Sequence, residues 1–327
     1  MPDPRLPLSL ESDEYRPLHG VTFALPTEPP TPKFQDRRWL HALLLLLTAA
    51  TTTLTGLAHY AAFLSELGAR TVSAGLGSLG YGVWYSGTIL AILGAHEMGH
   101  YLACRYYRVD ASLPYFIPAV GVLTGTFGAV IRIREPILYK RALFDIGIAG
   151  PIAGFVVAVP ALFTGLWLST VVPLPRGFTG LELGEPLLFK AASWLVWGTP
   201  PAGMTVNMHP MAFASWFGLL ATALNLFPIA QLDGGHISYA VLGRRSTFVT
   251  FGALACAAAL TAVSYSWLVW VVMIVVMLFL AGPRHPPVMD ELVPLDRTRM
   301  GLAVFAVVMF ALCFTPAPIE LLDLVPR

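Results

Sequence analysis

Charged side chains are scarce in this sequence, since only 12% of its 327 residues are Asp, Glu, Lys or Arg. A soluble globular chain carries about 25% charged residues, so the shortage excludes an ordinary soluble enzyme and a disordered protein. Hydrophobic residues make up 56% of the chain, and the mean hydropathy is +0.68. These values predict a multi-pass membrane protein. The net charge of +1 excludes the broad positive surface of a nucleic-acid-binding protein.

Cysteine is rare as well, and its distribution excludes two kinds of site. The three cysteines lie far apart in apolar stretches, at Cys104, Cys256 and Cys313. This spacing gives neither a disulfide framework nor a CxxC metal site, so we expect each thiol to pack as a small hydrophobic side chain. The pattern of a secretory signal peptide is missing too, because the first apolar run begins only at Trp39 and is too long.

Long hydrophobic runs take the place of charges. They predict an all-α polytopic membrane protein with about seven transmembrane helices. The expected spans are 39–63, 82–104, 142–172, 211–231, two helices within 247–282, and 300–315. The run 247–282 exceeds one crossing of about 20 residues, and Ser264-Tyr265-Ser266 provides a turn that divides it.

The positive charges predict an orientation for these spans. A cytoplasmic N-terminus puts sixteen Lys and Arg residues on the cytoplasmic side and four on the other, which is the bias expected from the positive-inside rule. The four are Arg70, Arg176, Lys190 and Arg327. We therefore expect residues 1–38 to form a polar, proline-rich cytoplasmic tail. Compact loops and the lack of targeting signals favour a bacterial or archaeal plasma (inner) membrane, and an organelle membrane stays open as the alternative.

Two connections between the spans have predicted structure of their own. Residues 105–141 are apolar for a cytoplasmic segment. Glycines and β-branched residues around Gly125, Thr126 and Gly128 predict a membrane-associated β-hairpin on the cytoplasmic side, at about 115–135. On the opposite side, the stretch FKAASWLVWG predicts a short interfacial helix.

Residues 96–100 read His-Glu-Met-Gly-His, an HExxH motif. Positions i and i+4 of a helix share one face, so His96 and His100 can bind one Zn²⁺. Glu97 lies beside them and can accept a proton from a metal-bound water. Ionisable residues at membrane depth are costly unless they are paired or bind a metal. The context therefore favours a functional site over a chance match.

A catalytic zinc needs a third protein ligand and one open position, and Asp233 is the candidate. The predicted span 211–231 runs toward the cytoplasm, so Asp233 arrives on the side that holds the two histidines. Pro228 should break the helix near Asn225, and Gly234 frees the backbone after Asp233. An unwound segment at membrane depth is tolerated where it lines a cavity.

The combination of HExxH in one span with N-x-x-P-x-x-x-L-D-G in a later span resembles the site-2 protease family of intramembrane zinc metalloproteases, peptidase family M50. The stretches Gly125–Gly128 and Phe144–Gly154 resemble segments of the same family. The resemblance covers about residues 82–245 and makes them the protease core. Residues 39–81 then form the first transmembrane helix with an outer loop, and 246–327 form the C-terminal transmembrane helices.

The resemblance also implies roles for individual residues. His96, His100 and Asp233 would bind one zinc ion per chain, and Glu97 would be the general base. Asn225 would position the scissile carbonyl or stabilise the oxyanion, although it could equally satisfy backbone groups freed by Pro228. Two residues nearby receive other interpretations. His236 could support the metal ligands, but we favour a position at the cytoplasmic surface, and we expect Asp145 in a helix cap or an ion pair with Arg141.

The implied reaction is hydrolysis of peptide bonds in or near transmembrane segments, in regulated intramembrane proteolysis. The partners would be a single-span membrane protein as substrate and the surrounding membrane lipids, and no feature predicts an oligomeric state. We further expect an unwound substrate to add to the hairpin as a strand. Two alternatives stay open, namely a transporter or channel with a metal-stabilised polar site and an inactive protease-like scaffold. A third ligand from glutamate is disfavoured, because the later apolar spans lack that residue.

Overall fold

The computed structural model describes residues 32–68, 70–71, 76–174, 179–229, 231–281 and 285–323. The chain divides into two units, Met1–Lys33 and Phe34–Arg327, and the second contains every element named below. Most of the predicted tail lies outside the described residues, but its last part is not a tail. The backbone N–H of Phe34 donates to Asp110 (2.6 Å), and Asp36 forms an ion pair with Arg134. The packed part of the chain therefore begins at Phe34.

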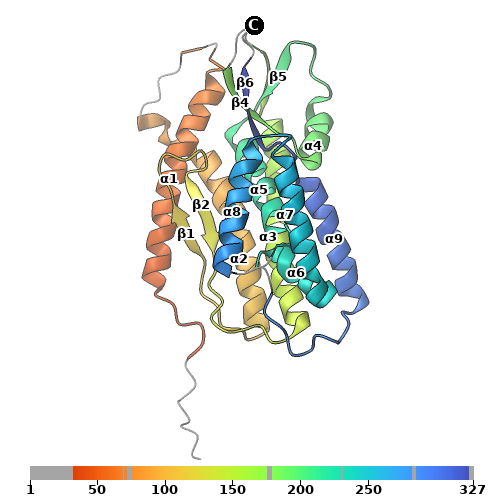
Figure 1. Cartoon of the computed structure of the whole chain (residues 1–327). Helices are drawn as coiled ribbons and strands as arrows, with labels where there is room; N and C mark the ends of the chain where they lie inside the picture. Colours follow the sequence, from red (N-terminus) through yellow and green to blue (C-terminus); the bar gives the residue numbers. More distant parts are fainter. Residues whose placement is uncertain are drawn as a thin grey trace, which may run out of the picture. The chain divides into compact units, whose positions relative to one another are not determined.

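The second unit is mostly helical, as predicted (Figure 1). Its helices are α1 (Arg38–Leu64), α2 (Val83–Tyr106), α3 (Lys140–Trp167), α4 (Leu187–Trp197), α5 (Pro210–Asn225), α6 (Asp233–Leu242), α7 (Ser246–Leu260), α8 (Ser266–Ala281) and α9 (Arg297–Cys313), with 3₁₀ turns at Leu76–Gly82 and Gly243–Arg245. Among the described helices, α1 and α3 are long and apolar enough to cross a membrane by the criteria of length and hydropathy. The other five predicted crossings stay predictions.

Two predicted helix breaks are confirmed. Helix α5 ends at Asn225, three residues before Pro228, and α6 starts only at Asp233. The run 247–282 is divided between α7 and α8 by residues 261–265. A short helix at the predicted stretch FKAASWLVWG is present as α4, and its place at a membrane interface stays a prediction.

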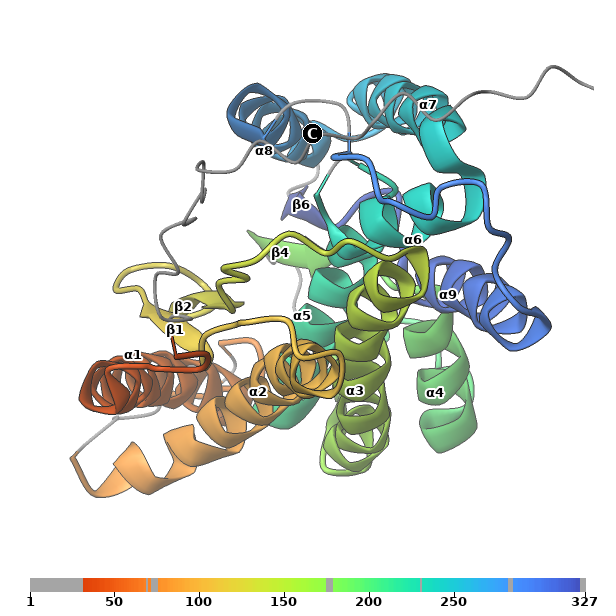
Figure 2. The ribbon, with the colours of Figure 1, turned by 90° about the horizontal axis from the view of Figure 1, so that it is seen from below.

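Helices α2, α3 and α5 pack against one another (Figure 2). Their shared core contains large buried side chains such as Tyr85 on α2, Phe144 on α3 and Trp216 on α5. Small residues let α2 and α3 approach closely, since a Cβ added to Gly99 would lie 2.5 Å from the carbonyl oxygen of Ala149. This close crossing lies within the HExxH segment.

Strands β1 (Tyr115–Pro118) and β2 (Thr126–Val130) pair antiparallel within the segment 115–135. The register shifts between Phe116 and Pro118, which leaves one extra residue in β2. Gly128 lies in this irregular part with φ +99°, a backbone conformation that favours glycine.

The turn between β1 and β2 is attached to α1 and α2 by three hydrogen bonds. Thr51 donates to the carbonyl of Gly125 (2.8 Å), the His59 ring bonds the carbonyl of Leu123 (2.9 Å), and Tyr85 donates to the carbonyl of Thr124 (2.9 Å). Gly125 has φ +69° and lies against α1. The strand pair therefore runs along α1 toward the beginning of α2 and does not stay at the end of the bundle where residues 105–114 lie.

The all-α prediction is wrong for four further strands. β3 (Thr170–Pro173) pairs with β5 (Met204–Asn207), and β4 (Thr179–Leu183) pairs with β6 (Ile319–Asp323), both antiparallel. The predicted span 142–172 ended too late, because the β-branched residues from Thr170 to Val172 favour a strand after α3 ends at Trp167. The β4–β6 pair joins the connection before α4 to the chain after α9.

Candidate active site

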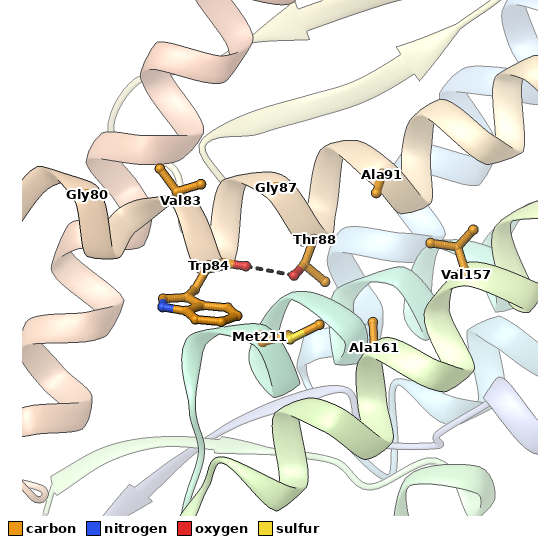
Figure 3. Close-up of a pocket in the computed structure, with 9 residues that line it drawn as sticks. All are labelled: Gly80, Val83, Trp84, Gly87, Thr88, Ala91, Val157, Ala161 and Met211. Atoms are coloured by element: carbon orange, nitrogen blue, oxygen red, sulfur yellow. Dashed lines mark hydrogen bonds between the residues drawn. The ribbon is translucent and has the colours of Figure 1, made fainter.

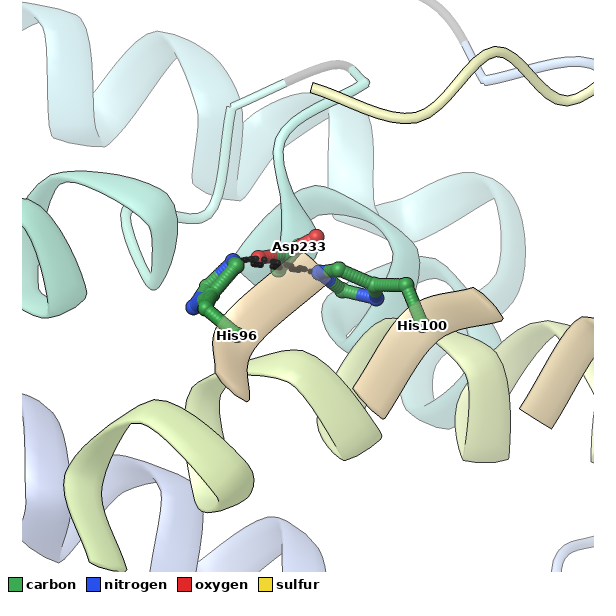
Figure 4. Close-up of side chains that lie close together, drawn as sticks. All are labelled: His96, His100 and Asp233. Atoms are coloured by element: carbon green, nitrogen blue, oxygen red, sulfur yellow. Dashed lines mark hydrogen bonds and ion pairs between the residues drawn. The ribbon is translucent and has the colours of Figure 1, made fainter. Parts of the chain in front are cut away.

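The three predicted metal ligands come together, and Figure 4 shows their side chains converging on one point. His96 and His100 are buried on α2, and Asp233 is the first residue of α6. The His96 and His100 Nε2 atoms lie 3.1 Å apart. Asp233 Oδ2 lies 3.2 Å from the first and 3.3 Å from the second. Two segments that are distant in sequence thus supply one compact donor set.

These separations fit zinc. Four ligands at about 2.0–2.1 Å from a tetrahedral zinc stand roughly 3.3–3.4 Å apart, close to the three observed values. Two neutral imidazoles and one carboxylate are also a donor set that zinc accepts. The tautomer of His100 is also the one that metal binding needs, because its Nδ1 lies 2.7 Å from the carbonyl of Ile146 and must donate to it. That leaves the Nε2 lone pair available for a metal.

Glycines of α3 make room for the imidazoles. A Cβ added to Gly150 would lie 2.1 Å from His100 Nε2, and one added to Gly154 would lie 3.2 Å from the His96 Cβ. Sequence reasoning noted these glycines within a resembling stretch but gave them no role. Their spacing, four residues apart on one helix face, was the available signal.

The loop between α5 and α6 brings Asp233 to the histidines. Gly234 is required there, because a Cβ would lie 2.0 Å from the carbonyl oxygen of Leu226. The carbonyl of Pro228 accepts a hydrogen bond from Thr250 on α7 (3.0 Å). Pro228 and Gly234 therefore support the site through the backbone path of this loop.

Two further polar side chains reach the same place. The Asn225 side-chain nitrogen lies 3.2 Å from His96 Nε2, so Asn225 faces the metal-binding atoms at the end of α5. Glu97 is buried, and its carboxylate faces the backbone of Ile131, directly after β2. Every residue that the sequence assigned to the reaction thus lines one site.

These residues line a cavity of about 240 Å³. The cavity also contacts β2 and the chain after it, through Ala129, Val130, Ile131 and Ile133. Its walls are therefore the HExxH face of α2, the glycine face of α3, the α5–α6 loop with the start of α6, and one strand.

The strand wall presents a free edge. The N–H of Ser112 donates to the carbonyl of Arg132 (2.9 Å), so Arg132 faces the β1 side. Since successive residues of an extended strand alternate, Ala129 and Ile131 turn their backbone groups the other way, toward the cavity that they line. Within the described residues β2 pairs only with β1.

Two neighbouring predictions are wrong. His236 does not lie free at the surface: it lines the cavity and bonds His285 at 2.7 Å. Asp145 pairs with Arg299 of α9 rather than with Arg141, through contacts of 2.8 and 2.5 Å, and it also accepts a hydrogen bond from Tyr107.

The Asp145–Arg299 pair fastens the start of α9 to the core. Asp296 caps α9 through a bond from the backbone N–H of Arg299 (3.0 Å). This bond, together with the Arg299 guanidinium, lowers the pKa of Asp296 below its usual value. Arg299 thus connects the caps of two helices, since Tyr107 directly follows α2.

A second and larger cavity, of about 580 Å³, lies between α2, α3 and α5 (Figure 3). Its lining is apolar except for Thr88, which donates to the carbonyl of Trp84 within α2 (2.7 Å). The described residues that line this cavity include no acid, base or metal ligand, whereas the smaller cavity is lined by all three predicted metal ligands and Glu97.

A helical bundle that holds two imidazoles, one carboxylate and an adjacent buried glutamate defines an HExxH metallohydrolase site. The model of the family described as Peptidase family M50 matches residues 84–264, more than half of the chain. The chain belongs to peptidase family M50. The family and the apolar helices α1 and α3 also identify it as a membrane protein.

Curated relatives agree with this family. The protein named "Probable zinc metalloprotease EGY2, chloroplastic" of Oryza sativa subsp. indica is 30% identical over 243 residues, which is 71% of this chain and 42% of that protein. The Arabidopsis thaliana protein named "Probable zinc metalloprotease EGY1, chloroplastic" is 34% identical over 171 residues, 50% of this chain and 30% of the relative. The chain thus spans less than half the length of these relatives. No solved structure matches it.

Proposed function

We propose that this chain is a zinc metalloendopeptidase that cuts peptide bonds in or near transmembrane segments of other membrane proteins. The observation that carries the proposal is the donor set of His96, His100 and Asp233, spaced at 3.1–3.3 Å with Glu97 beside it. The family and the printed names of the relatives support zinc as the metal. Bound zinc would polarise the scissile carbonyl and lower the pKa of a water molecule.

Glu97 would act as general base and then as general acid. It takes a proton from the attacking water as the oxygen bonds to the carbonyl carbon, and gives it to the amine nitrogen as the C–N bond breaks. The backbone N–H of Ile131 faces the Glu97 carboxylate. Burial of Glu97 keeps competing bulk water away from this proton transfer.

Asn225 would stabilise the developing oxyanion. Its side-chain nitrogen lies at the metal-binding atoms (3.2 Å from His96 Nε2) and can donate to an oxygen there. Asn225 also lines the cavity that holds the three metal ligands, and this position supports the catalytic interpretation.

The substrate would bind as an extended strand at the free edge of β2. An unwound segment exposes backbone N–H and C=O groups, which must be satisfied at membrane depth. The backbone N–H and C=O of Ala129 and the C=O of Ile131 can pair with these groups, within the cavity that holds the metal ligands. We expect a single-span membrane protein as substrate.

The membrane orientation is proposed from the charge distribution. Sixteen of the twenty Lys and Arg residues fall on one side in the predicted topology, and the site then opens toward the cytoplasmic side. The relatives named above are chloroplastic, so they do not support a plasma membrane for this chain.

Zinc analysis together with cleavage of a single-span substrate tests the proposed reaction. We expect one zinc per chain in both wild type and Glu97→Gln, with cleavage lower by at least about 100-fold in the variant because the base is lost. A transporter would instead show flux linked to the metal. Wild-type protein without zinc and without cleavage would contradict the proposal.

Proline substitutions test binding at the strand edge. Ala129→Pro removes an N–H from the free edge, whereas Ala129→Ser changes the side chain and keeps that N–H. We expect the proline variant to cleave about tenfold more slowly with unchanged zinc content. Equal rates for the two variants would exclude substrate pairing at this edge.

A further inference from the structure

The metal-site cavity contains a polar side chain that the proposed reaction does not use, His236 on α6. Its Cβ packs against α3, where a Cβ added to Gly147 would lie 3.0 Å away. Figure 2 shows β2 and α6 on opposite sides of α5, and both line the cavity. His236 therefore belongs to the wall that faces the strand edge.

Hydrogen bonds define which nitrogen of His236 carries the proton. His285 Nδ1 lies 2.7 Å from the carbonyl of Pro286, which can only accept, so this nitrogen donates. His285 Nε2 is then an acceptor in the neutral ring and takes the proton of His236 Nδ1 at 2.7 Å. His236 is left with an Nε2 that carries a lone pair and no proton.

The surroundings of His285 favour this arrangement. Its ring stacks on Tyr239, with centroids 4.4 Å apart and an interplanar angle of 21°. Burial lowers the pKa of His285, which supports the neutral ring. The chain of Pro286, His285 and His236 thus fixes a hydrogen-bond acceptor at the wall of the cavity.

A strand bound in this cavity has two edges. One would pair with β2, and its other N–H and C=O groups would point toward the α6 wall. An N–H without a partner in such a cavity costs free energy comparable to a lost hydrogen bond. The α6 wall must therefore supply an acceptor if the substrate binds as a strand.

We propose that His236 binds the substrate by accepting a hydrogen bond at Nε2 from a backbone N–H on the edge turned away from β2, and that His285 is the positioning residue that maintains this tautomer. The inference rests on the proposed function, since it takes an extended peptide as the ligand. His236 would thus be a second binding contact for the substrate backbone, in addition to the pairing with β2.

Binding of a peptide to the Glu97→Gln protein tests the role of His236 without cleavage. The probe is a single-span peptide in detergent micelles, made with and without an ester in place of one backbone amide at each position near the cut. His236→Phe should weaken binding of the all-amide peptide about tenfold. His236→Gln, whose amide oxygen can replace Nε2 as acceptor, should recover most of the loss.

The ester series separates a hydrogen bond from a structural effect. One ester position should weaken binding to the His236-containing protein and make no further difference in His236→Phe. Unchanged binding in His236→Phe, or an ester penalty of the same size in both proteins, would overturn the proposal. Zinc content should stay at one per chain in every variant.

His285 has its own pair of variants. His285→Phe should reproduce the loss seen for His236→Phe, and the double variant should lose no more than either one, because both remove one contact. His285→Gln keeps an acceptor for His236 Nδ1–H and should bind nearly as well as the parent. Additive losses would exclude the positioning role.

The outcomes distinguish this inference from the proposed function. A wild-type chain that cleaves, with an inactive Glu97→Gln and a fully binding His236→Phe, overturns the inference alone. A wild-type chain that neither holds zinc nor cleaves overturns the proposed function, and the inference falls with it.

Discussion

The two halves of α2 differ in how closely they pack against α3. In the second half, Gly150 and Gly154 of α3 bring the helices together around the imidazoles of His96 and His100. In the first half, Gly87 and Ala91 of α2 lie beside a cavity of about 580 Å³. Glycine and alanine occur in both halves, so small residues produce close packing only where a neighbouring side chain fills the space they leave.

The largest expected effect comes from adding one methyl group in the tight half. Gly150→Ala would place a carbon 2.1 Å from His100 Nε2, so the imidazole must move. We expect zinc affinity to fall by about 10–100-fold and cleavage to fall with it. Zinc titration against a competing chelator measures this change.

Gly87→Ala is the matched control in the loose half. Its added Cβ would have Val83 Cγ1 at 4.0 Å as its nearest neighbour, so zinc affinity and cleavage should stay within twofold of wild type. The higher helix propensity of alanine should stabilise the fold by up to about 1 kcal/mol. Similar zinc affinities for the two variants would contradict the contrast between the halves.

The next effect concerns the link from the tight half to α9. Arg299→Met removes the partner of Asp145 and of the Tyr107 hydroxyl while keeping most of the side-chain volume. The pair is largely but not fully shielded, with side-chain exposures of 21% and 24%. We expect a loss of about 1–2 kcal/mol in the free energy of unfolding in detergent, with Arg141→Met as a control that changes it little.

The smallest effect is expected from filling the larger cavity. Ala161→Leu adds three carbons from α3 into a space lined by apolar groups. The change in stability should stay below about 1.5 kcal/mol in either direction, and cleavage and zinc content should match wild type. A strong loss of cleavage would show that this cavity takes part in the reaction.

The metal site was predictable from sequence because its information is local. The spacing of His96 and His100 places them on one helix face, and Pro228 and Gly234 mark the broken backbone before and after Asp233. The distribution of Lys and Arg then predicted that these two segments lie on the same side of the membrane. The structure adds distances and the supporting glycines.

What sequence could not supply depends on contacts between distant segments. Arg299 reaches Asp145 from 154 residues away, and His285 reaches His236 from 49 residues away. No local pattern identifies such partners. The sequence therefore predicted Arg141 as the partner of Asp145 and the protein surface as the place of His236. The β4–β6 pair was missed for the same reason, because a single short strand has no partner within its own segment.

The β4–β6 pair has a consequence for the order of events during synthesis. Both metal-binding segments, on α2 and α6, leave the ribosome before β6 does, so the donor set can assemble while β4 still lacks its partner. β4 can pair with β6 only after α4–α9 have been synthesised, and closing a loop of this length is slow. The metal-binding site can therefore form before the β4–β6 pair completes the opposite end of the bundle, so the two steps are separate in time.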